Sequence, residues 1–441
     1  MGQDVAKVGP PRWIFLHPII MSMPNVNIEL IAAILFATAL IHTFCARQFE
    51  RLSHRYPRHA GLFHLLGEVE VIFGFWAIVL IFCMAVLSGG RNALDYVESR
   101  QYTEPLFVFV VMVVAASRPI LELVLFSIDL MTKLIPIRRS MAKAWLGFAA
   151  IPLLGSAITE PAAMTIAALM LAPQVFRTAV PEPLKYFALG VLFVNVSIGG
   201  TLTSFAAPPV LMVADTWNWN SEFMFATFGW KAAIAVVINA TIAVFVLRPH
   251  LSEQDQVSGG FARLRAPTIL IAVHVLFLIS VVLLAHHPVA FLGLFLMFLG
   301  ITQAYERHQN PLILKEALLV AFFLAGLVVL GGLQQWWLQP VITNLAPEVL
   351  FVGATALTAV TDNAALTYLG SLITGISDQA KYSLVAGAVA GGGLTIIANA
   401  PNPAGAALLK NGFADRTIGA GGLFIGALLP TMIAILVFAL L

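Results

Sequence analysis

The sequence predicts an all-α polytopic membrane protein. Of its 441 residues, 60% are hydrophobic and 10% are charged, whereas charged residues make up about a quarter of a typical soluble domain. The mean hydropathy of +0.92 excludes a soluble globular protein, a disordered chain and a nucleic-acid-binding protein. The formal net charge of +2 is too small to indicate an acidic partner. Because one bilayer-spanning helix needs about 20 apolar residues, the chain has room for about ten to twelve crossings and for no large domain outside the membrane.

Apolar segments follow one another along almost the whole chain. The first 27 residues, which precede them, are interrupted by prolines and contain no small-residue cleavage site, so we expect no cleaved signal peptide. The third segment contains Arg118-Pro119 and should be kinked there, because proline removes a helical hydrogen bond. The segments are predicted at 28–44, 67–88, 104–131, 145–172, 184–198, 223–247, 267–287, 288–305, 312–338, 349–373, 381–397 and 417–441.

Lysine and arginine concentrate in the cytoplasmic loops of membrane proteins, and here they predict two re-entrant hairpins. Segment 145–172 has basic residues before and after it and is interrupted at Gly155 and Pro161, so we expect a hairpin that enters from the cytoplasm. The linker 339–348 lacks Lys and Arg, as an external loop should, and segment 349–373 leaves that side and returns to it. The N-terminus should lie outside. The inside positions rest on Arg47, Arg51, Arg55, Arg58, Lys133, Arg138, Arg139, Lys143, Arg177, Lys185, Arg248, Arg263, Arg265, Arg307 and Lys315.

The two hairpin regions repeat in sequence. Residues 156–165 read SAITEPAAMT and residues 358–367 read TAVTDNAALT, with an acid opposite an acid. A second pair follows in the same order, GGTLTSFAAPP at 199–209 and GGGLTIIANAP at 391–401. Alanine- and glycine-rich membrane sequences match easily by chance, so either pair alone is weak evidence. Two pairs in the same order indicate an internal repeat.

These features together predict two inverted-topology repeats, each with a re-entrant hairpin and a broken transmembrane helix. Such repeats are typical of secondary transporters, whose binding site lies near mid-membrane where the broken helices meet. The predicted parts are an N-terminal segment with the first helix and a basic loop (1–66), a first repeat (67–250, with its hairpin at 145–172 and its broken helix at 184–215), a linker helix (251–287) and a second repeat (288–441, with its hairpin at 349–373 and its broken helix at 381–410).

Two acidic residues, Glu160 and Asp362, lie deep inside apolar segments. An acidic side chain at the bilayer centre costs about 2.5–3.5 kcal/mol on insertion scales, so each residue needs a reason to be there. A structural reason exists for both, because Thr159-Glu160-Pro161 could open a helix and Asp362 could cap one. A functional reason exists as well, because Thr361, Asp362 and Asn363 concentrate oxygen-bearing side chains at one hairpin tip. The two roles are compatible.

The glycine runs predict unwound backbone beside the two tips. Gly199-Gly200 and Gly391-Gly392 are poor helix interior, and non-helical backbone at membrane depth is tolerated only where it is buried or lines a cavity. Its free carbonyl groups and the nearby polar side chains are hard oxygen ligands of the kind that a dehydrated Na⁺ accepts. Close packing of helices through small residues is the alternative explanation. The polar side chains concerned are Thr201, Thr203, Ser204, Thr395, Asn399 and Asn402. Asn195 and Ser197 approach the first run, but each taken alone is more simply explained as a hydrogen-bonding group between helices.

At residues 361–371, which read TDNAALTYLGS, the chain resembles the ion transporter superfamily. That superfamily contains sodium/proton antiporters, sodium-coupled carboxylate symporters and arsenite exporters. Within it, the chain resembles a family of putative sodium/proton antiporters over the two motif pairs and the order of segments, residues 60–441. The resemblance implies re-entrant hairpins, a homodimer formed by a scaffold domain, and elevator-like movement of the hairpin domain.

The hairpin tips differ from those of carboxylate-transporting relatives, which commonly have a Ser-Asn-Thr signature at both tips. Here acids stand in Thr159-Glu160-Pro161 and in Thr361-Asp362-Asn363. Two carboxylates in a small, dry cavity would repel an anionic substrate, and a carboxylate that holds either H⁺ or Na⁺, but not both, is sufficient for exchange. We therefore expect an antiporter of a monovalent cation. Pro161 argues against a symmetrical two-ion site.

In this hypothesis Asp362 is the principal carboxylate, and Glu160 is its partner or a second proton site. The transported species are H⁺ and Na⁺, or Li⁺ or K⁺ in its place, and no bound cofactor is expected. Asp362, Asn363 and Glu160 would be the Na⁺ ligands. The remaining candidate ligands are Thr159, Thr361, Thr203, Thr395, Thr201, Asn399 and Asn195, with the backbone of Gly199, Gly200, Gly391 and Gly392.

Two other classes of function stay open from sequence. A sodium-coupled symporter or exporter of a small organic or inorganic anion would need a cationic or hydroxyl-rich cradle, and no Lys or Arg stands near either tip. An intramembrane enzyme would use Glu160 and Asp362 as paired acids, but the repeat and the hairpins have no role in such chemistry. We therefore expect that the protein is not an enzyme. We also expect it to be a multi-pass protein of the bacterial inner membrane. Its expected partners are the lipid bilayer, protons, a monovalent cation and a second copy of the chain, but no nucleic acid.

Overall fold

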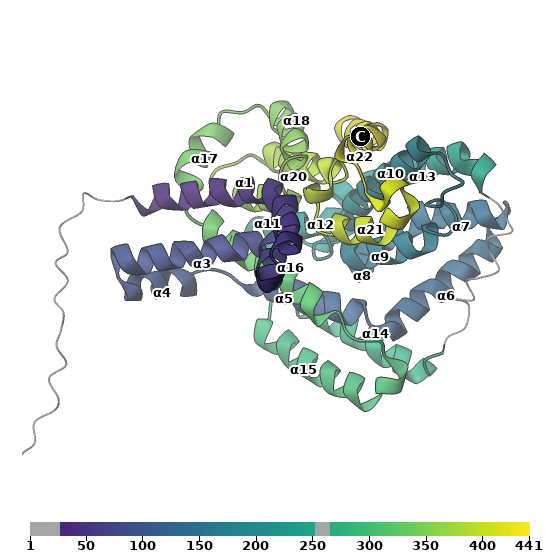
Figure 1. The fold of residues 1–441 in the computed structure, drawn as a ribbon, viewed down its shortest axis with the longest axis horizontal. Helices are drawn as coiled ribbons and strands as arrows, with labels where there is room; N and C mark the ends of the chain where they lie inside the picture. The colour runs from purple at the N-terminus through teal and green to yellow at the C-terminus, as the bar shows by residue number, and fades with distance from the viewer. Residues whose placement is uncertain (1–26, 252–264) are drawn as a thin grey trace, which may run out of the picture.

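The computed structural model describes residues 27–251 and 265–441, and Figure 1 shows them folded into helices joined by turns. The regular elements of this part of the chain are α-helices with short 3-10 and π-helical turns, so the predicted all-α class is confirmed. The N-terminal stretch, for which we expected no signal peptide, and Arg263, one of the orientation residues, lie outside the described residues.

The first half of the chain mixes long apolar helices with short helices that meet at breaks. Asn27 begins the first of them, because its side chain accepts a hydrogen bond of 3.0 Å from the Glu29 N–H. The helices are α1 (Ile28–Arg55), α2 (Ala60–Gly67), α3 (Val69–Ser88), α4 (Gly90–Glu98), α5 (Thr103–Ala115), α6 (Arg118–Leu134), α7 (Arg139–Phe148), α8 (Ala150–Ile158), α9 (Glu160–Leu171), α10 (Glu182–Gly199), α11 (Pro208–Trp217), α12 (Ser221–Met224) and α13 (Trp230–Leu247).

The second half has the same kind of helices in a similar order. Both halves contain a helix that stops at a glycine run, passes through a short 3-10 turn and resumes several residues later: Gly200–Leu202 follows α10, and Ile396–Ala398 follows α20. The helices are α14 (Thr268–Leu283), α15 (Pro288–Ala304), α16 (Leu314–Gly331), α17 (Gln335–Ile342), α18 (Pro347–Thr358), α19 (Asn363–Ser371), α20 (Asp378–Gly391), α21 (Asn402–Leu409) and α22 (Ala420–Leu440).

Within the described residues, six helices are long and apolar enough to cross a membrane, or up to eight if each bent pair counts as one span. The sequence predicted about ten to twelve crossings, and the difference has a physical reason: several apolar segments fold as short helices such as α9, α14, α15 and α18. The predicted kink is confirmed, because α5 and α6 are bent by 64° at the break before Arg118-Pro119.

The first helix is longer than predicted. We expected it to end near residue 44 and to be followed by a basic loop, but α1 continues to Arg55 and only Arg58 lies beyond it, in a 3-10 turn. The extension is helical because the basic segment contains no glycine and no proline before Pro57. The basic region is therefore mostly helix.

Glycines allow the long helices to pack closely. A Cβ on Gly326 of α16 would clash with the backbone of Gly74 in α3, and a Cβ on Gly190 of α10 would clash with the backbone of α22 near Ala427. Such contacts bring backbones together through small residues, as in other membrane helix bundles. Of the six candidate spans among the described residues, the one that contains α10 is the most enclosed, with 83% of its residues buried.

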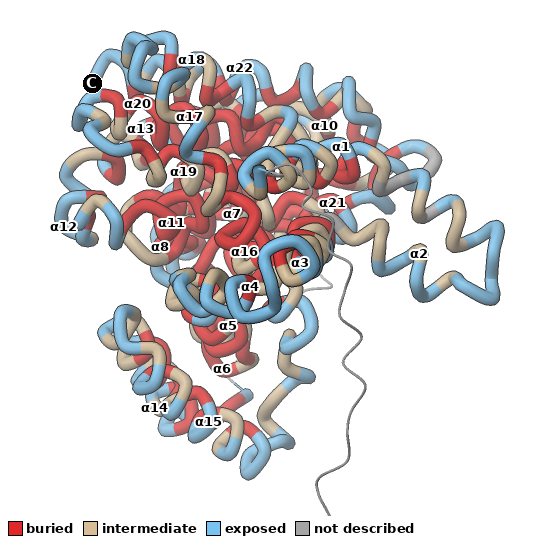
Figure 2. The backbone as a smooth tube through the Cα atoms, turned by 90° about the vertical axis from the view of Figure 1, so that its left-hand side faces the viewer, coloured by how far each residue is buried: buried red, intermediate tan, exposed pale blue. Residues whose placement is uncertain are grey.

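The hairpin regions and the broken helices form the centre of the protein. Figure 2 shows buried backbone concentrated in α7, α8, α11 and α19, whereas α2 is mostly exposed or intermediate. The two halves are interleaved there: α9 packs against α21, and α11 packs against α19. Residues that lie some 200 positions apart in the sequence are thereby brought to one place.

Candidate functional site

The first hairpin turns at Thr159 and Glu160. α7 and α8, bent by 41°, form its first arm, and α9 forms its second. Thr159 has a φ of 76°, a left-handed conformation that β-branched residues rarely adopt. Pro161 stands in the first turn of α9, where its fixed φ suits the start of a helix. Its missing N–H costs no hydrogen bond there, because the first N–H groups of a helix have no partner within the helix. The carboxyl group of Glu160 thus sits at the positive end of α9.

Glu160 is the most completely enclosed carboxyl group of this region, with 0% of its surface exposed. Its Oε2 accepts a hydrogen bond of 2.8 Å from Asn399 Nδ2, which belongs to the second half of the chain. Its Oε1 has no hydrogen-bond partner. A Cβ on Gly200 would clash with that Oε1, so the glycine run makes room for the carboxyl group. The first hairpin and both glycine breaks therefore meet at Glu160.

The second hairpin turns at Asp362, which caps α19. Asp362 Oδ1 accepts hydrogen bonds from the N–H groups of Ala364 (2.8 Å) and Ala365 (3.2 Å). The structural role proposed for this residue from sequence is therefore confirmed, and 9% of its surface remains exposed. Asn363, the next residue, is fully buried and donates from Nδ2 to Ser197 Oγ at 3.4 Å. Ser197 in turn donates to the Val389 carbonyl at 2.8 Å.

Each glycine break is tied to the hairpin of its own half. In the first half, Ser156 Oγ donates to the Gly199 carbonyl at 2.7 Å, and Thr203 Oγ1 donates to the Ser156 carbonyl at 2.7 Å. In the second half, Thr395 Oγ1 donates to the Ala359 carbonyl at 3.0 Å. These bonds satisfy backbone groups that the helix breaks leave unpaired.

Several buried oxygen atoms around the two tips have no hydrogen-bond partner. They lie on residues from both hairpins and from the second break, and they are acceptor oxygens of carboxyl, amide and hydroxyl groups. Leaving such an atom unpaired costs about 1–3 kcal/mol, and oxygen donors of this kind suit a small hard cation. Among the described residues, no three His, Cys, Asp or Glu side chains gather as a group that could hold a metal ion. The atoms are Thr159 Oγ1, Glu160 Oε1, Asn363 Oδ1, Asn399 Oδ1 and Asn402 Oδ1.

Other predicted site residues are used differently. Asn195 is engaged between helices: its Nδ2 donates to the Phe148 carbonyl at 2.8 Å, and its Oδ1 accepts from Asn239 Nδ2 at 2.9 Å. Thr201 donates to the Ile198 carbonyl at 2.7 Å, within its own turn. Thr361 lies half-buried directly before the cap residue Asp362.

The glycines of the two runs divide between packing and the site. A Cβ on Gly199 would meet the Pro152 carbonyl at 2.6 Å, and one on Gly391 would meet the Thr355 carbonyl at 2.5 Å, so these two allow hairpin and broken helix to touch. By contrast, a Cβ on Gly200 would strike Glu160, and one on Gly392 would lie 3.0 Å from Asn363 Nδ2 and strike Ser197. Small-residue packing thus explains the first glycine of each pair and not the second.

Two residues beside the tips were not singled out from sequence. Ser156 bridges the first hairpin and the first break, and its place at the start of the repeated motif was the signal that could have found it. Glu70, near the start of α3, lies within electrostatic range of Asp362. No sequence pattern connects α3 with the second hairpin, so only the tertiary fold reveals this neighbour.

A methyl group at Gly200 should disturb the site without disturbing the backbone. Gly200 has a φ of −73°, so alanine is conformationally allowed there, but its Cβ would displace the Glu160 carboxyl group. We expect Gly200→Ala to lower the free energy of unfolding by about 1–3 kcal/mol. The melting temperature in detergent measures this. Gly353→Ala in α18, where a Cβ meets nothing within 4 Å, is the control and should be neutral or stabilising. Equal melting temperatures for the two variants would contradict the expectation.

The fold and the enclosed carboxyl groups define an integral multi-pass membrane protein with broken helices around a buried polar centre. The family described as "Putative Na+/H+ antiporter" matches residues 27–441. The chain belongs to this family, which points to a transporter of cations and protons and away from an enzyme. No curated protein matches the chain.

Proposed function

We propose that the protein is a secondary active transporter that exchanges Na⁺ for H⁺, with Glu160 and Asp362 as the carboxylates that hold the two ions in turn. The observation that supports this most directly is Glu160 itself, a fully buried carboxyl group with one oxygen unpartnered. A bare carboxylate is costly in such a place, so the side chain is stable there only with a proton or a cation. A carboxyl group that holds a proton cannot hold a cation at the same time. Binding of one ion therefore releases the other, and this competition couples their transport.

The proposed cation ligands come from both halves of the chain. Glu160 Oε1, Asn399 Oδ1 and Thr159 Oγ1 are unpartnered oxygens on the first tip and the second break. Asn363 Oδ1 is their counterpart on the second tip, beside Asp362. Thr361, Thr203, Thr395 and carbonyl groups of the glycine breaks would complete the shell, and Li⁺ or K⁺ could replace Na⁺.

The buried centre leads us to revise the ranking of the two carboxylates. Asp362 already accepts two backbone hydrogen bonds through Oδ1, which stabilise its charged form without any cation. Glu160 accepts one hydrogen bond, from a neutral amide. Glu160 therefore depends more on a bound ion, and we propose it as the principal exchange carboxylate, with Asp362 as its partner.

Packing supports the proposed inverted repeat. The repeat pairs α3, α5, α9 and α11 of the first half with α15, α16, α19 and α21 of the second. α3 packs on α16, and its counterpart α15 packs on α5. α9 packs on α21, and its counterpart α19 packs on α11. In this pairing α14 corresponds to α1, since α14 contacts α15 and α5 where α1 contacts α3 and α16. The helix that the sequence suggested as a linker would then open the second repeat. Contacts that match when the two halves of the chain are interchanged fit two hairpins that enter the membrane from opposite faces.

Alternating access would follow from movement of the hairpins and broken helices against the remaining helices, in the manner of an elevator. The proposed moving part comprises α7–α13 and α18–α22, and α1, α3, α5 and α14–α16 would form the scaffold and the contact between two copies of the chain. We propose the bacterial inner membrane as its location, with the N-terminus outside.

Proton flux in sealed vesicles tests this proposal. Purified protein is reconstituted with an acidic lumen, and Na⁺, Li⁺ or K⁺ is added outside. We expect the added cation to raise the luminal pH, because each cation carried into the lumen is exchanged for a proton that the carboxylates carry out of it. Protein-free vesicles are the control. If no monovalent cation changes the luminal pH in folded protein, the exchange proposal is wrong. Na⁺-dependent uptake of a labelled carboxylate would then favour an anion symporter.

A further inference from the structure

A cavity lies beyond the first glycine break. It has a volume of about 570 Å³ and is bounded by the start of α5, the end of α11, the start of α12 and the end of α14. Its inner wall includes Ser204 and Phe205, which follow Thr203 of the break directly. Ser204 Oγ contacts Ser221 Oγ at 3.1 Å, so the wall is fastened to α12. The cavity therefore lies between the proposed scaffold helices and the proposed moving helices.

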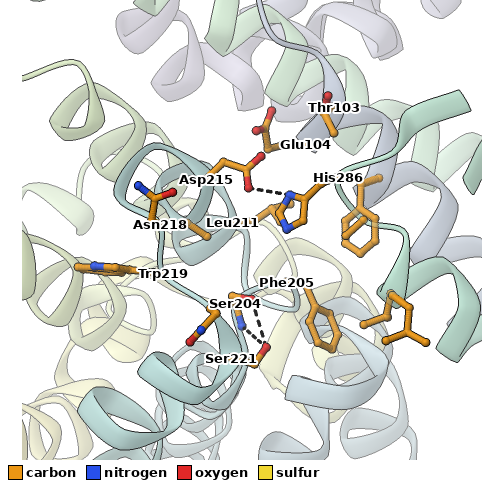
Figure 3. A pocket seen from close by; sticks show the side chains of 16 residues that line it. Thr103, Glu104, Ser204, Phe205, Leu211, Asp215, Asn218, Trp219, Ser221 and His286 are labelled. Atoms are coloured by element: carbon orange, nitrogen blue, oxygen red, sulfur yellow. Dashed lines mark hydrogen bonds and ion pairs between the residues drawn. The ribbon is translucent and has the colours of Figure 1, made fainter. Parts of the chain in front are cut away.

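Three titratable side chains gather at this cavity, one from each of three helices. His286, just after α14, contacts Asp215 of α11 through Nδ1 and Oδ1 at 2.7 Å. Figure 3 shows the carboxyl group of Glu104, from α5, beside that of Asp215. Among the described residues that line the cavity, these three are the titratable ones. Other titratable residues lie on or next to the helices around the cavity but do not line it. They are Arg100 and Tyr102 before α5, Glu222 of α12, His287 after α14 and Tyr368 of α19.

The charges of these three side chains decide whether they attract or repel one another. A protonated His286 attracts Asp215, and a proton shared by Glu104 and Asp215 allows their carboxyl groups to touch. Loss of both protons leaves a neutral imidazole and two adjacent carboxylates, which repel each other. Histidine is the side chain that ordinarily changes charge between about pH 5 and 8. The contact between α11 and the two scaffold helices should therefore weaken as the pH rises.

We propose that Glu104, Asp215 and His286 form a proton-dependent latch that holds α11 against α5 and α14 and releases it when protons are lost. The latch rests on the proposed function, because it assumes that α11 moves with the broken helix during exchange. It would make exchange slow when protons are abundant on the cavity side of the membrane and faster when they are scarce. The latch acts on movement and not on the cation ligands.

Two replacements of His286 should shift the exchange rate in opposite directions. Glutamine is neutral at every pH, so His286→Gln should exchange about two- to fivefold faster than the wild type at acidic pH, as expected for loss of an exposed ion pair. Lysine stays charged, so His286→Lys should be slower by a similar factor at alkaline pH. At acidic pH, Asp215→Asn should resemble His286→Gln, because it also removes the attraction between residues 215 and 286. His287→Gln, on a neighbour outside the cavity lining, is the matched control and should follow the wild-type profile.

A labelling experiment tests the latch without transport. Ala214, beside Asp215 and 6% exposed, is replaced by cysteine in a chain without Cys45 and Cys83. At one fixed pH, a membrane-impermeant maleimide should modify this cysteine about two- to fivefold faster with His286→Gln than with His286→Lys. If the labelling rates are equal and both variants keep the wild-type pH profile, the latch is wrong. If wild-type vesicles show no cation-driven proton flux, the proposed function fails, and the labelling rates alone decide the latch.

Discussion

Replacing Glu160 by glutamine should reduce cation-driven proton flux to the level of protein-free vesicles. Glutamine keeps the shape of the side chain and can still accept the hydrogen bond from Asn399, but it holds neither a proton nor a cation in exchange. The fold should tolerate the change, because a neutral amide is less costly to bury than a carboxylate. The flux assay and the melting temperature in detergent measure the two effects separately.

A matched control is available on the second hairpin. Glu348 is exposed in the first turn of α18, so Glu348→Gln should leave both flux and melting temperature unchanged. Glu160→Asp, which keeps the acid but shortens the side chain, should retain exchange with a higher apparent KM for the cation. Wild-type flux in Glu160→Gln would remove Glu160 from the mechanism and leave Asp362 as the remaining candidate.

Asp362 offers a second test, because its structural and its proposed functional role can be separated. Asp362→Asn keeps an oxygen that can cap α19, since Asn and Asp are about equally good at this position, but it removes the titratable group. We expect normal folding and strongly reduced proton flux. Asp362→Ala removes the cap as well and should lower the free energy of unfolding by about 1 kcal/mol more.

The comparison of the two Asp362 variants distinguishes a cap from a carrier. If Asp362→Asn exchanges cations at the wild-type rate while Asp362→Ala is less stable, the residue serves the hairpin only and Glu160 acts alone. If Asp362→Asn is inactive and melts at the wild-type temperature, the carboxyl group takes part in exchange. Thermal unfolding and flux, measured on the same preparations, provide both readouts.

Local features of the sequence were sufficient to predict the helical class and the places where helices break. The helix that follows the first tip begins at Glu160 and the one after the second tip at Asn363, because Pro161 and Asp362 are local start signals. The glycine runs ended α10 and α20 for the same local reason. For Asn195 the sequence left two roles open, a ligand beside the first run or a hydrogen-bonding group between helices. Its side chain has the second role, because it is directed to α7 and α13.

The sequence by itself determined that this chain is a membrane protein and which polar residues stand at helix breaks, because hydrophobicity and the conformational limits of glycine and proline act over a few residues. Only the tertiary structure decided which of these residues meet. Glu160 pairs with Asn399 and Asn363 with Ser197, partners that lie 239 and 166 residues apart. The latch cavity likewise joins α5, α11 and α14. Such pairings depend on how whole helices pack, and this packing cannot be predicted from a pattern of a few residues.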